Sequence, residues 1–180
     1  MDTMQYTHLY RSPLGTITLA ADSEGLTGLW FEGQKYFAAT LDDQHEETML
    51  PIFEQTRRWL DNYFGGNDPG PTPPLHLQGS PFRLAVWEIL RQIPFGKTIT
   101  YGEIAREIAR RQGSKTVPAQ AVGGAVGHNP VSIIVPCHRV VGSNGSLTGY
   151  AGGIERKVRL LALEKADMTG LFAPQKGTAL

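Results

Sequence analysis

Ten residues rich in glycine and proline divide this chain into two parts with different patterns. They run from Gly65 to Pro74 and include three glycines and four prolines, a composition typical of a linker. A regular helix or strand is not expected to continue through them, because proline lacks a backbone donor and fixes its own φ. The sequence therefore predicts two domains, residues 1–78 and 79–167, and a tail at residues 168–180 for which it allows disorder.

The first part has the pattern of a small α+β domain. Residues 5–31 alternate in polarity and contain turn signals at Pro13–Gly15 and Asp22–Gly25, which predicts a meander of three strands. Apolar side chains then recur at helical spacing within residues 48–64, which predicts an amphipathic helix. Its buried stripe is expected to comprise Ile52, Thr56, Trp59, Leu60 and Tyr63.

The second part is predominantly helical. Ser80 and Pro81 are suited to begin a helix. The buried stripe of that helix is expected to comprise Phe82, Val86, Ile89 and Ile93. Thr100 and Glu103 have the spacing of a capping box, and Thr116 is placed to cap a third helix. The second and third helices are joined by a polar turn, as in a helix-turn-helix, although this turn is longer than usual.

The third helix is unusual because residues 118–126 contain almost nothing large. Its two adjacent glycines, Gly123 and Gly124, each cost about 1 kcal/mol of helix stability relative to alanine. Two explanations remain open. Either the helix packs closely against another helix, or its backbone approaches a broad partner such as the minor groove of DNA.

Charge is distributed unevenly although the chain is neutral overall. Residues 1–78 carry 4 basic and 11 acidic residues, a net charge of −7, whereas residues 79–180 carry 13 and 6, a net charge of +7. A basic second part favours an anionic partner, of which nucleic acid is the commonest large one. A merely basic surface is the alternative.

The only cysteine, Cys137, stands between Pro136 and His138. An apolar run at residues 131–135 precedes it, so we expect a strand that ends at Pro136 and presents the thiol at its end. Single cysteines are mostly buried and inert. A thiol beside a residue that titrates near neutral pH is nevertheless suited to nucleophilic catalysis. Because neighbours in a strand face opposite sides, His138 would need a turn or a bridging water to serve Cys137.

Several classes of protein are disfavoured. One cysteine excludes an intrachain disulfide and fits a reducing, cytoplasmic compartment. No apolar run is long enough for a membrane span, and residues 1–5 lack the features of a signal peptide. The five histidines show no metal-ligand spacing, so neither a metal nor another cofactor is expected.

The segment Pro136-Cys137-His138-Arg139-Val140 resembles the active-site motif of the O6-alkylguanine-DNA alkyltransferases, the methylated-DNA–protein-cysteine methyltransferases. Further segments resemble motifs of that family in the same order: residues 100–103, 121–125, 129–130, 149–153 and 160–164. The similarity covers residues 80–166, whereas residues 1–78 resemble the family only in size and pattern. It implies a small ribonuclease-H-like N-terminal domain and a helix-turn-helix, winged-helix-like C-terminal domain.

The resemblance also implies an activity, which is DNA repair by direct, irreversible and stoichiometric transfer of an alkyl group to Cys137 after nucleotide flipping. The donor would be O6-alkylguanine, with O4-alkylthymine as a further candidate. His138 would be the base, acting through a water, and Glu164 would orient its imidazole. Asn129 would tie the third helix to the cysteine strand, and Tyr101 would crowd the 3′ phosphate and help to protonate the leaving guanine.

By the same resemblance, the base pocket would comprise Val140, Tyr150, Ala151, Gly152 and Gly153. The partner would be double-stranded DNA bearing alkylated bases, bound on its minor-groove side by a monomer. The DNA-binding residues would be Ala119, Gln120, Gly123 and Gly124. One departure is Gln120, because the commonest family pattern has an arginine there that fills the gap left by the flipped nucleotide. Glutamine can hydrogen-bond in that gap but lacks the charge and the broad guanidinium plane.

Two other functions fit parts of the pattern. A lesion-binding protein related to the alkyltransferases would hold the flipped base without reacting, but such proteins replace the acceptor that Cys137 supplies here. A cysteine hydrolase with a Cys–His–Glu triad would turn over repeatedly, although adjacent Cys137 and His138 suit direct contact poorly.

Overall fold

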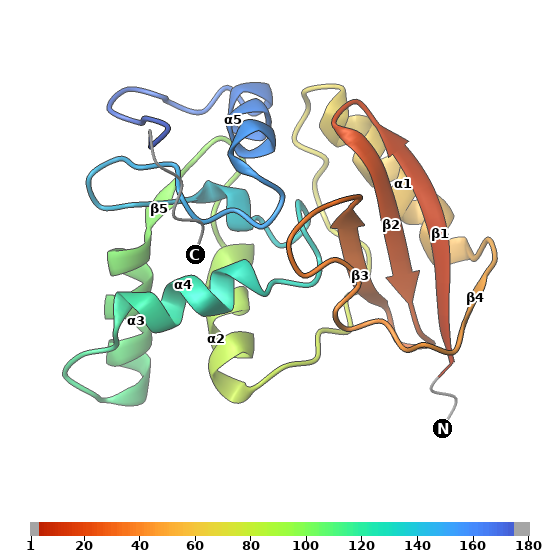
Figure 1. Ribbon diagram of the computed structural model, residues 1–180, viewed down its shortest axis with the longest axis horizontal. Coiled ribbons are helices and arrows are strands. Elements are labelled where there is room, and N and C mark those ends of the chain that lie inside the picture. Colours follow the sequence, from red (N-terminus) through yellow and green to blue (C-terminus); the bar gives the residue numbers. More distant parts are fainter. Residues whose placement is uncertain (1–3, 175–180) are drawn as a thin grey trace. The chain divides into compact units, whose positions relative to one another are not determined.

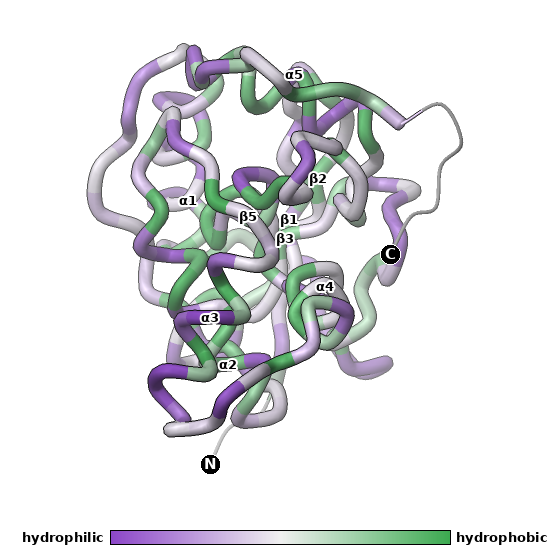
Figure 2. Tube along the Cα trace, turned by 90° about the vertical axis from the view of Figure 1, so that its left-hand side faces the viewer, coloured by the Kyte–Doolittle hydropathy of each residue, from purple (hydrophilic) through white to green (hydrophobic). Residues whose placement is uncertain are grey.

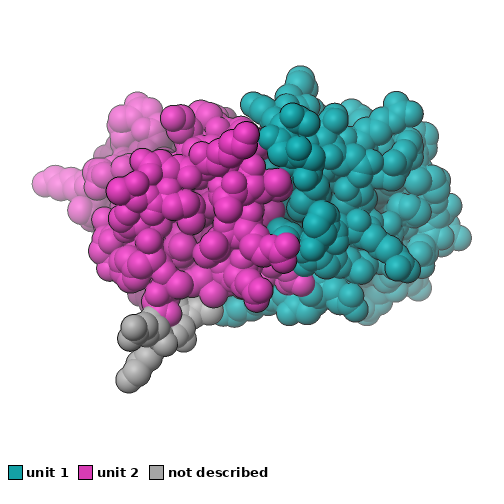
Figure 3. All heavy atoms as spheres, turned by 90° about the horizontal axis from the view of Figure 1, so that it is seen from above, with its two compact units in different colours: residues 1–78, 130–134 teal, residues 79–129, 135–180 magenta. Residues whose placement is uncertain are grey.

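The computed structural model describes residues 4–174 of the chain, which form two compact units (Figure 3). Among the described residues, the first unit groups residues 4–78 with residues 130–134, and the second groups residues 79–129 with 135–174. Residues 130–134, which the sequence assigned to the second domain, therefore cluster with the first. Within the described residues, no helix is both long and apolar enough to cross a membrane.

The first unit is a four-stranded sheet with one helix against it (Figure 1). Strands β1 (Gln5–Ser12), β2 (Gly15–Ala21) and β3 (Leu26–Phe31) form the predicted antiparallel meander. Strand β4 (His45–Glu47) adds in parallel to β1, giving the order β3-β2-β1-β4. Sequence patterns missed β4 because it is three residues long and fully exposed.

Helix α1 (Pro51–Phe64) packs on this sheet through an aromatic face. It begins with Pro51 at its first turn, where the missing N–H needs no partner, rather than at residue 48. The ring of Phe53 stacks on His8 at 5.9 Å, and Tyr10 donates to Asp61 at 2.7 Å. The predicted stripe is confirmed for Thr56, Trp59, Leu60 and Tyr63, but Phe53 takes the buried place expected for Ile52, which is half-buried.

Residues 130–134 join the first unit along the edge of the sheet that β3 forms. The N–H of Leu29 donates to Pro130 at 2.8 Å, and the N–H of Ser132 donates to Leu29 at 3.1 Å. The prediction of a strand at residues 131–135 is wrong. Of these five residues, only Val131 pairs with a strand, in an isolated bridge to Leu29. Ile133 adopts the left-handed conformation, φ 69°, which interrupts an extended chain.

The second unit is built on three helices that pack on one another: α2 (Pro81–Arg91), α3 (Tyr101–Gln112) and α4 (Ala119–Gly127). Ser80 caps α2 and the Thr100–Glu103 capping box starts α3, as predicted. Of the stripe expected on α2, Val86, Ile89 and Ile93 are buried, but Phe82 is only half-buried. Helices α3 and α4 and the turn between them form the helix-turn-helix.

Helix α4 differs from its neighbours in composition and in its cap. Figure 2 shows alternating hydrophilic and hydrophobic bands along α3, whereas α4 is formed mainly by alanine, valine and glycine. The helix begins after Pro118 without a side-chain cap, so the prediction that Thr116 caps it is wrong. Trp87 of α2 donates its indole N–H to the Ala125 carbonyl at 2.8 Å, which fixes the two helices together.

The rest of the second unit follows α4. Cys137–Arg139 form a single-turn 3-10 helix, η1, and β6 (Val140–Val141) then pairs in parallel with β5 (Ile99–Thr100). Helix α5 (Ile154–Leu163) follows a long loop. Of the stripe expected on α5, Leu161 is fully buried, but Val158 is half-buried and Ile154 is exposed.

The beginning of the predicted tail is ordered. Phe172 exchanges backbone hydrogen bonds with the loop before α5, donating to Gly145 at 3.0 Å and accepting from Leu147 at 2.9 Å. Met168 and Leu171 pack against a small core of the second unit formed by Val141, Leu147, Leu161 and Ala166. Residues 175–180 lie outside the described part of the chain.

Candidate active site

The thiol of Cys137 lies at the start of η1 and is only 3% exposed. The N–H of Cys137 donates to Val135 at 2.8 Å across Pro136, and Arg139 donates to Pro136 at 3.0 Å. The expected location at a strand end is therefore wrong, because the chain coils at this point. A 3-10 turn removes the strict alternation of a strand, so Cys137 and His138 are not held on opposite faces.

His138 and Glu164 form the centre of the site. Nε2 of His138 lies 2.5 Å from Oε2 of Glu164, and neither side chain is exposed to solvent. Glu164 is the C-cap residue of α5, which packs against η1. The sequence placed both residues in one site on the resemblance alone, and the structure brings them into contact.

Arg139 and Gly96 also donate hydrogen bonds to the Glu164 carboxylate. Arg139 donates Nε to Oε1 at 2.8 Å and Nη2 to Oε2 at 3.1 Å, and the N–H of Gly96 donates to Oε1 at 2.9 Å. Burial by itself raises the pKa of Glu164, but the hydrogen bonds from His138 and Arg139 and the charge of Arg139 outweigh it and hold that pKa well below its usual range. Glu164 is therefore an ionised acceptor at neutral pH.

Burial lowers the pKa of His138, against the opposing influence of Glu164, and the charges of Arg139 and Lys157 lower it further. The imidazole is thus neutral near pH 7. Because an ionised carboxylate can only accept, the proton of this neutral ring belongs on Nε2. Nδ1 then carries the basic lone pair, which is the arrangement that a proton acceptor for a thiol requires.

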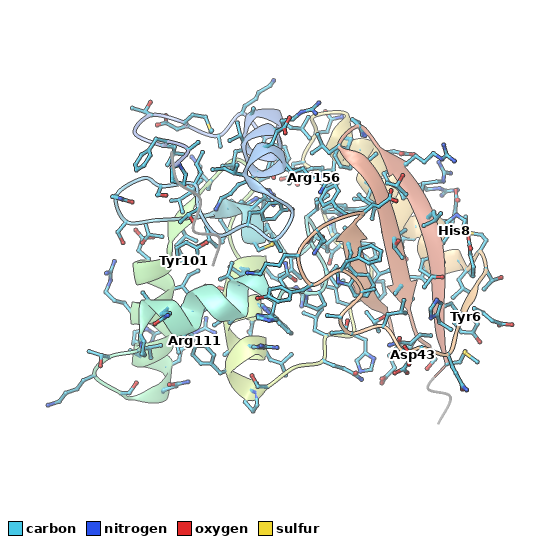
Figure 4. All side chains as sticks on the ribbon, in the orientation of Figure 1. Tyr6, His8, Asp43, Tyr101, Arg111 and Arg156 are labelled. Carbon is cyan, nitrogen blue, oxygen red and sulfur yellow. The ribbon has the colours of Figure 1, made fainter. Side chains whose placement is uncertain are left out.

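Asn129 and Tyr101 hold the segments around Cys137. Asn129 follows α4 and donates Nδ2 to the Val135 carbonyl at 2.7 Å, so it ties the helix-turn-helix to the turn before the thiol. Tyr101, at the start of α3 (Figure 4), donates its hydroxyl to the Thr148 carbonyl at 3.1 Å. Burial, and then the charge of Cys137, raises the pKa of Tyr101, which keeps the phenol protonated near the thiol.

A buried lysine, Lys157, is part of this site and was missed in the sequence. Its Nζ donates to the carbonyls of Val140 at 2.5 Å and of Thr148 at 3.2 Å, and the residue is fully buried on α5. Burial lowers the pKa of Lys157 to about 8, although the charge of Cys137 opposes this shift. One signal could have revealed it: Lys157 lies three and four residues before Leu160 and Leu161, on the buried face of the predicted helix.

The expected base-pocket residues divide into two groups. Val140, Tyr150 and Gly152 are buried, and the Tyr150 ring meets His138 edge-on with centroids 6.3 Å apart. A side chain at Gly152 would displace Tyr150, because a Cβ there would lie 2.5 Å from the Tyr150 ring. Ala151 is half-buried and Gly153 is exposed, and Gly153 serves as the N-cap of α5 with φ 93°.

The expected DNA-binding residues lie along α4. Ala119 and Gln120 are exposed, Gly123 is buried and Gly124 is half-buried. A Cβ built on Gly124 would have nothing within 4 Å, so packing inside this unit does not explain that glycine. Close helix packing, one of the two explanations for the small residues, therefore fails at Gly124.

One cluster of possible metal ligands was not foreseen. Asp22, Glu24 and His76 of the first unit have ligand atoms within 4.8 Å of one another. Nδ1 of His76 faces Asp22 at 2.5 Å, whereas Nε2 faces Glu24 at 3.1 Å. Since the two ring nitrogens point to different carboxylates, the arrangement is that of an imidazole clamped by two acids.

Comparisons with known proteins assign both parts of the chain. The family model described as 6-O-methylguanine DNA methyltransferase, ribonuclease-like domain, matches residues 5–75, and the one described as its DNA binding domain matches residues 81–166. A methylated-DNA–protein-cysteine methyltransferase of Haemophilus influenzae is 42% identical over 92% of this chain and 88% of the relative. A relative of the same name from Methanosarcina acetivorans is also 42% identical, over 88% of this chain and 97% of the relative.

Solved structures agree. The crystal structure of Mycobacterium tuberculosis OGT in complex with DNA is 40% identical with a TM-score of 0.76, covering 93% of this chain and 99% of that one. The chain therefore belongs to the 6-O-methylguanine DNA methyltransferase family.

Proposed function

We propose that the chain repairs DNA by moving an alkyl group from O6 of guanine to Sγ of its own Cys137. The observation that carries this proposal is the buried His138–Glu164 pair, in which His138 directly follows the only cysteine of the sequence, in the unit that the DNA-binding family model matches. Relatives named methylated-DNA–protein-cysteine methyltransferase support it.

The chemistry follows from the protonation states. Glu164 holds the His138 proton on Nε2, so Nδ1 accepts the thiol proton of Cys137 through a water. The thiolate attacks the alkyl carbon in line, forming a C–S bond while the C–O bond breaks. The electron pair of that bond passes to guanine, which takes up a proton with help from Tyr101. The product thioether has no route back to a thiol, so each molecule acts once.

The helix-turn-helix binds the DNA duplex. Helix α4 presents exposed Gln120 and the open backbone at Gly124 to the minor groove of a duplex. The alkylated nucleotide leaves the stack because a base inside a duplex cannot reach a buried thiol. The flipped base is then enclosed by a pocket that comprises Val140, Tyr150 and the backbone of residues 151–153. The protein acts as a monomer in the reducing cytoplasm, where its acceptor stays a thiol.

A turnover measurement separates the three functions that the sequence allowed. Duplex DNA with O6-methylguanine is supplied in tenfold excess, and repaired guanine is counted over time. An alkyl acceptor stops at one repaired guanine per protein molecule. A lesion-binding protein repairs none, and continued release of product would identify a hydrolase.

A further inference from the structure

Arg139 has no part in the proposed chemistry, although it belongs to the Pro136–Val140 motif and is only 7% exposed. Its Nη1 donates to the Ile93 carbonyl at 2.7 Å, and its guanidinium lies 5.9 Å from the centroid of the Phe95 ring. Its other two nitrogens bind Glu164. An arginine held inward in this way is not available to bind DNA phosphates, which is the usual task of arginine in a basic DNA-binding unit.

The contacts of Glu164 show what Arg139 does. Oε1 accepts from Arg139 and Gly96, and Oε2 accepts from His138 and Arg139. The negative charge is therefore divided between a permanent cation and a titratable ring. Since a guanidinium is always protonated, it is the imidazole that can change its charge.

We propose that Arg139 is a positioning residue that keeps His138 a neutral base, by neutralising the Glu164 carboxylate that would otherwise hold a second proton on the imidazole. The inference rests on the proposed function, because it concerns the base that serves Cys137. Lys157 on α5 and the Tyr150 ring also lie near His138, and Cys137 precedes it on the same turn. Arg139 binds both oxygens of Glu164.

The test is the pH dependence of a single methyl transfer from duplex O6-methylguanine, measured for the parent, Arg139→Gln and Arg139→Lys. In the parent, the transfer rate should fall on the acid side of its pH profile, the acid limb, only below about pH 6.5, the ordinary pKa of histidine. In Arg139→Gln, the pKa of His138 should rise, so the acid limb should move up by about one pH unit or more. Transfer should then be about tenfold slower near pH 7 and should recover at higher pH. Arg139→Lys keeps the charge but loses the two-point contact, so its limb should lie between the two.

Arg159 on the exposed side of α5 provides the matched control. Arg159→Gln removes one positive charge from the same unit and should leave the acid limb at the parental pH. A uniform loss of rate in Arg139→Gln, with the limb unmoved, would show that Arg139 serves the fold alone and would overturn the proposal.

A second measurement needs no variant and covers the case in which both Arg139 variants fail to fold. Nitrogen NMR of the parent should show His138 as a neutral ring with its proton on Nε2 at pH 7. An imidazolium at that pH would overturn the proposal. A parent that transfers no methyl group would contradict the proposed function instead, whereas the NMR result would still judge whether His138 is a neutral ring.

Discussion

Nε2 of His138 lies 2.5 Å from Oε2 of Glu164, with both side chains wholly removed from solvent. A buried carboxylate in such a pair stabilises the fold only as long as its partners are present. Because the pKa of Glu164 is lowered in the folded state, its contribution is present above the ordinary glutamate pKa and is lost as pH falls below it. The same contact therefore links the stability of the fold to the base that we propose for Cys137.

Glu164→Gln should lower the free energy of unfolding by about 3–5 kcal/mol at pH 7, because it leaves the Arg139 charge buried without its anion. Denaturant unfolding of the parent and the variant measures this. Glu155→Gln, an exposed change on the same helix, should stay within about 0.5 kcal/mol. Equal small effects of the two changes would mean that the buried network contributes little.

Lys157 should make stability depend on pH on the alkaline side. Burial lowers its pKa to about 8 in the folded chain, whereas the value for an exposed lysine is about 10.4. Between these values the unfolded chain binds more protons at this position, so the free energy of unfolding rises with pH, by up to about 3 kcal/mol. Denaturant unfolding across that pH window should show the parent gaining stability relative to Lys157→Met. If the free energies of unfolding of the two proteins changed in parallel with pH, the lowered pKa of Lys157 would be contradicted.

Gly124→Ala should stabilise the free protein and weaken its binding to duplex DNA. Nothing lies within 4 Å of the added Cβ, and alanine is favoured over glycine in a helix by about 1 kcal/mol. If DNA approaches the α4 backbone closely, the methyl group will lower affinity several-fold. Thermal unfolding and DNA titration measure the two effects, and the rate with free O6-benzylguanine, which should not change, is the control. Undiminished DNA affinity would remove Gly124 from the interface.

Gln120 should matter only when a nucleotide has to leave the stack. Gln120→Ala should slow transfer from duplex DNA but leave transfer from free O6-benzylguanine nearly unchanged, since only the duplex reaction includes an unstacking cost of a few kcal/mol. Gln120→Arg should match or exceed the parent rate on duplex DNA, because a guanidinium adds charge and stacks better. If Gln120→Ala slowed both substrates equally, the residue would shape the pocket or the fold instead.

Elements that depend on local pattern could be predicted from the sequence. The meander of β1–β3 and the caps at Ser80 and Thr100 rest on turn residues, alternation and capping spacing, and the structure confirms them. The coil at Cys137 was not predicted, because an apolar run of five residues reads as a strand unless its partners are known. Only long-range contacts reveal that residues 130–134 pair instead with Leu29.

Some residues of the candidate site could be predicted from the sequence and others could not, for a similar reason. The motif pointed to Cys137, His138 and Glu164, although residues 137 and 164 are far apart in the chain. Lys157 and Arg139 escaped attention because a basic residue on a helix or beside a motif is normally exposed. Their burial is a tertiary property, set by the carbonyls of Val140 and Thr148 for one and by Glu164 for the other.

The most direct measurement is the location and number of transferred methyl groups. The protein is incubated with duplex DNA that carries O6-methylguanine with an isotopically labelled methyl group, then digested, and its peptides are analysed by mass spectrometry. The account predicts one labelled methyl group per molecule, on Cys137 alone, and none in Cys137→Ser, which should still bind the DNA. A label on any other residue, or more than one methyl group removed from DNA per protein molecule, would contradict it.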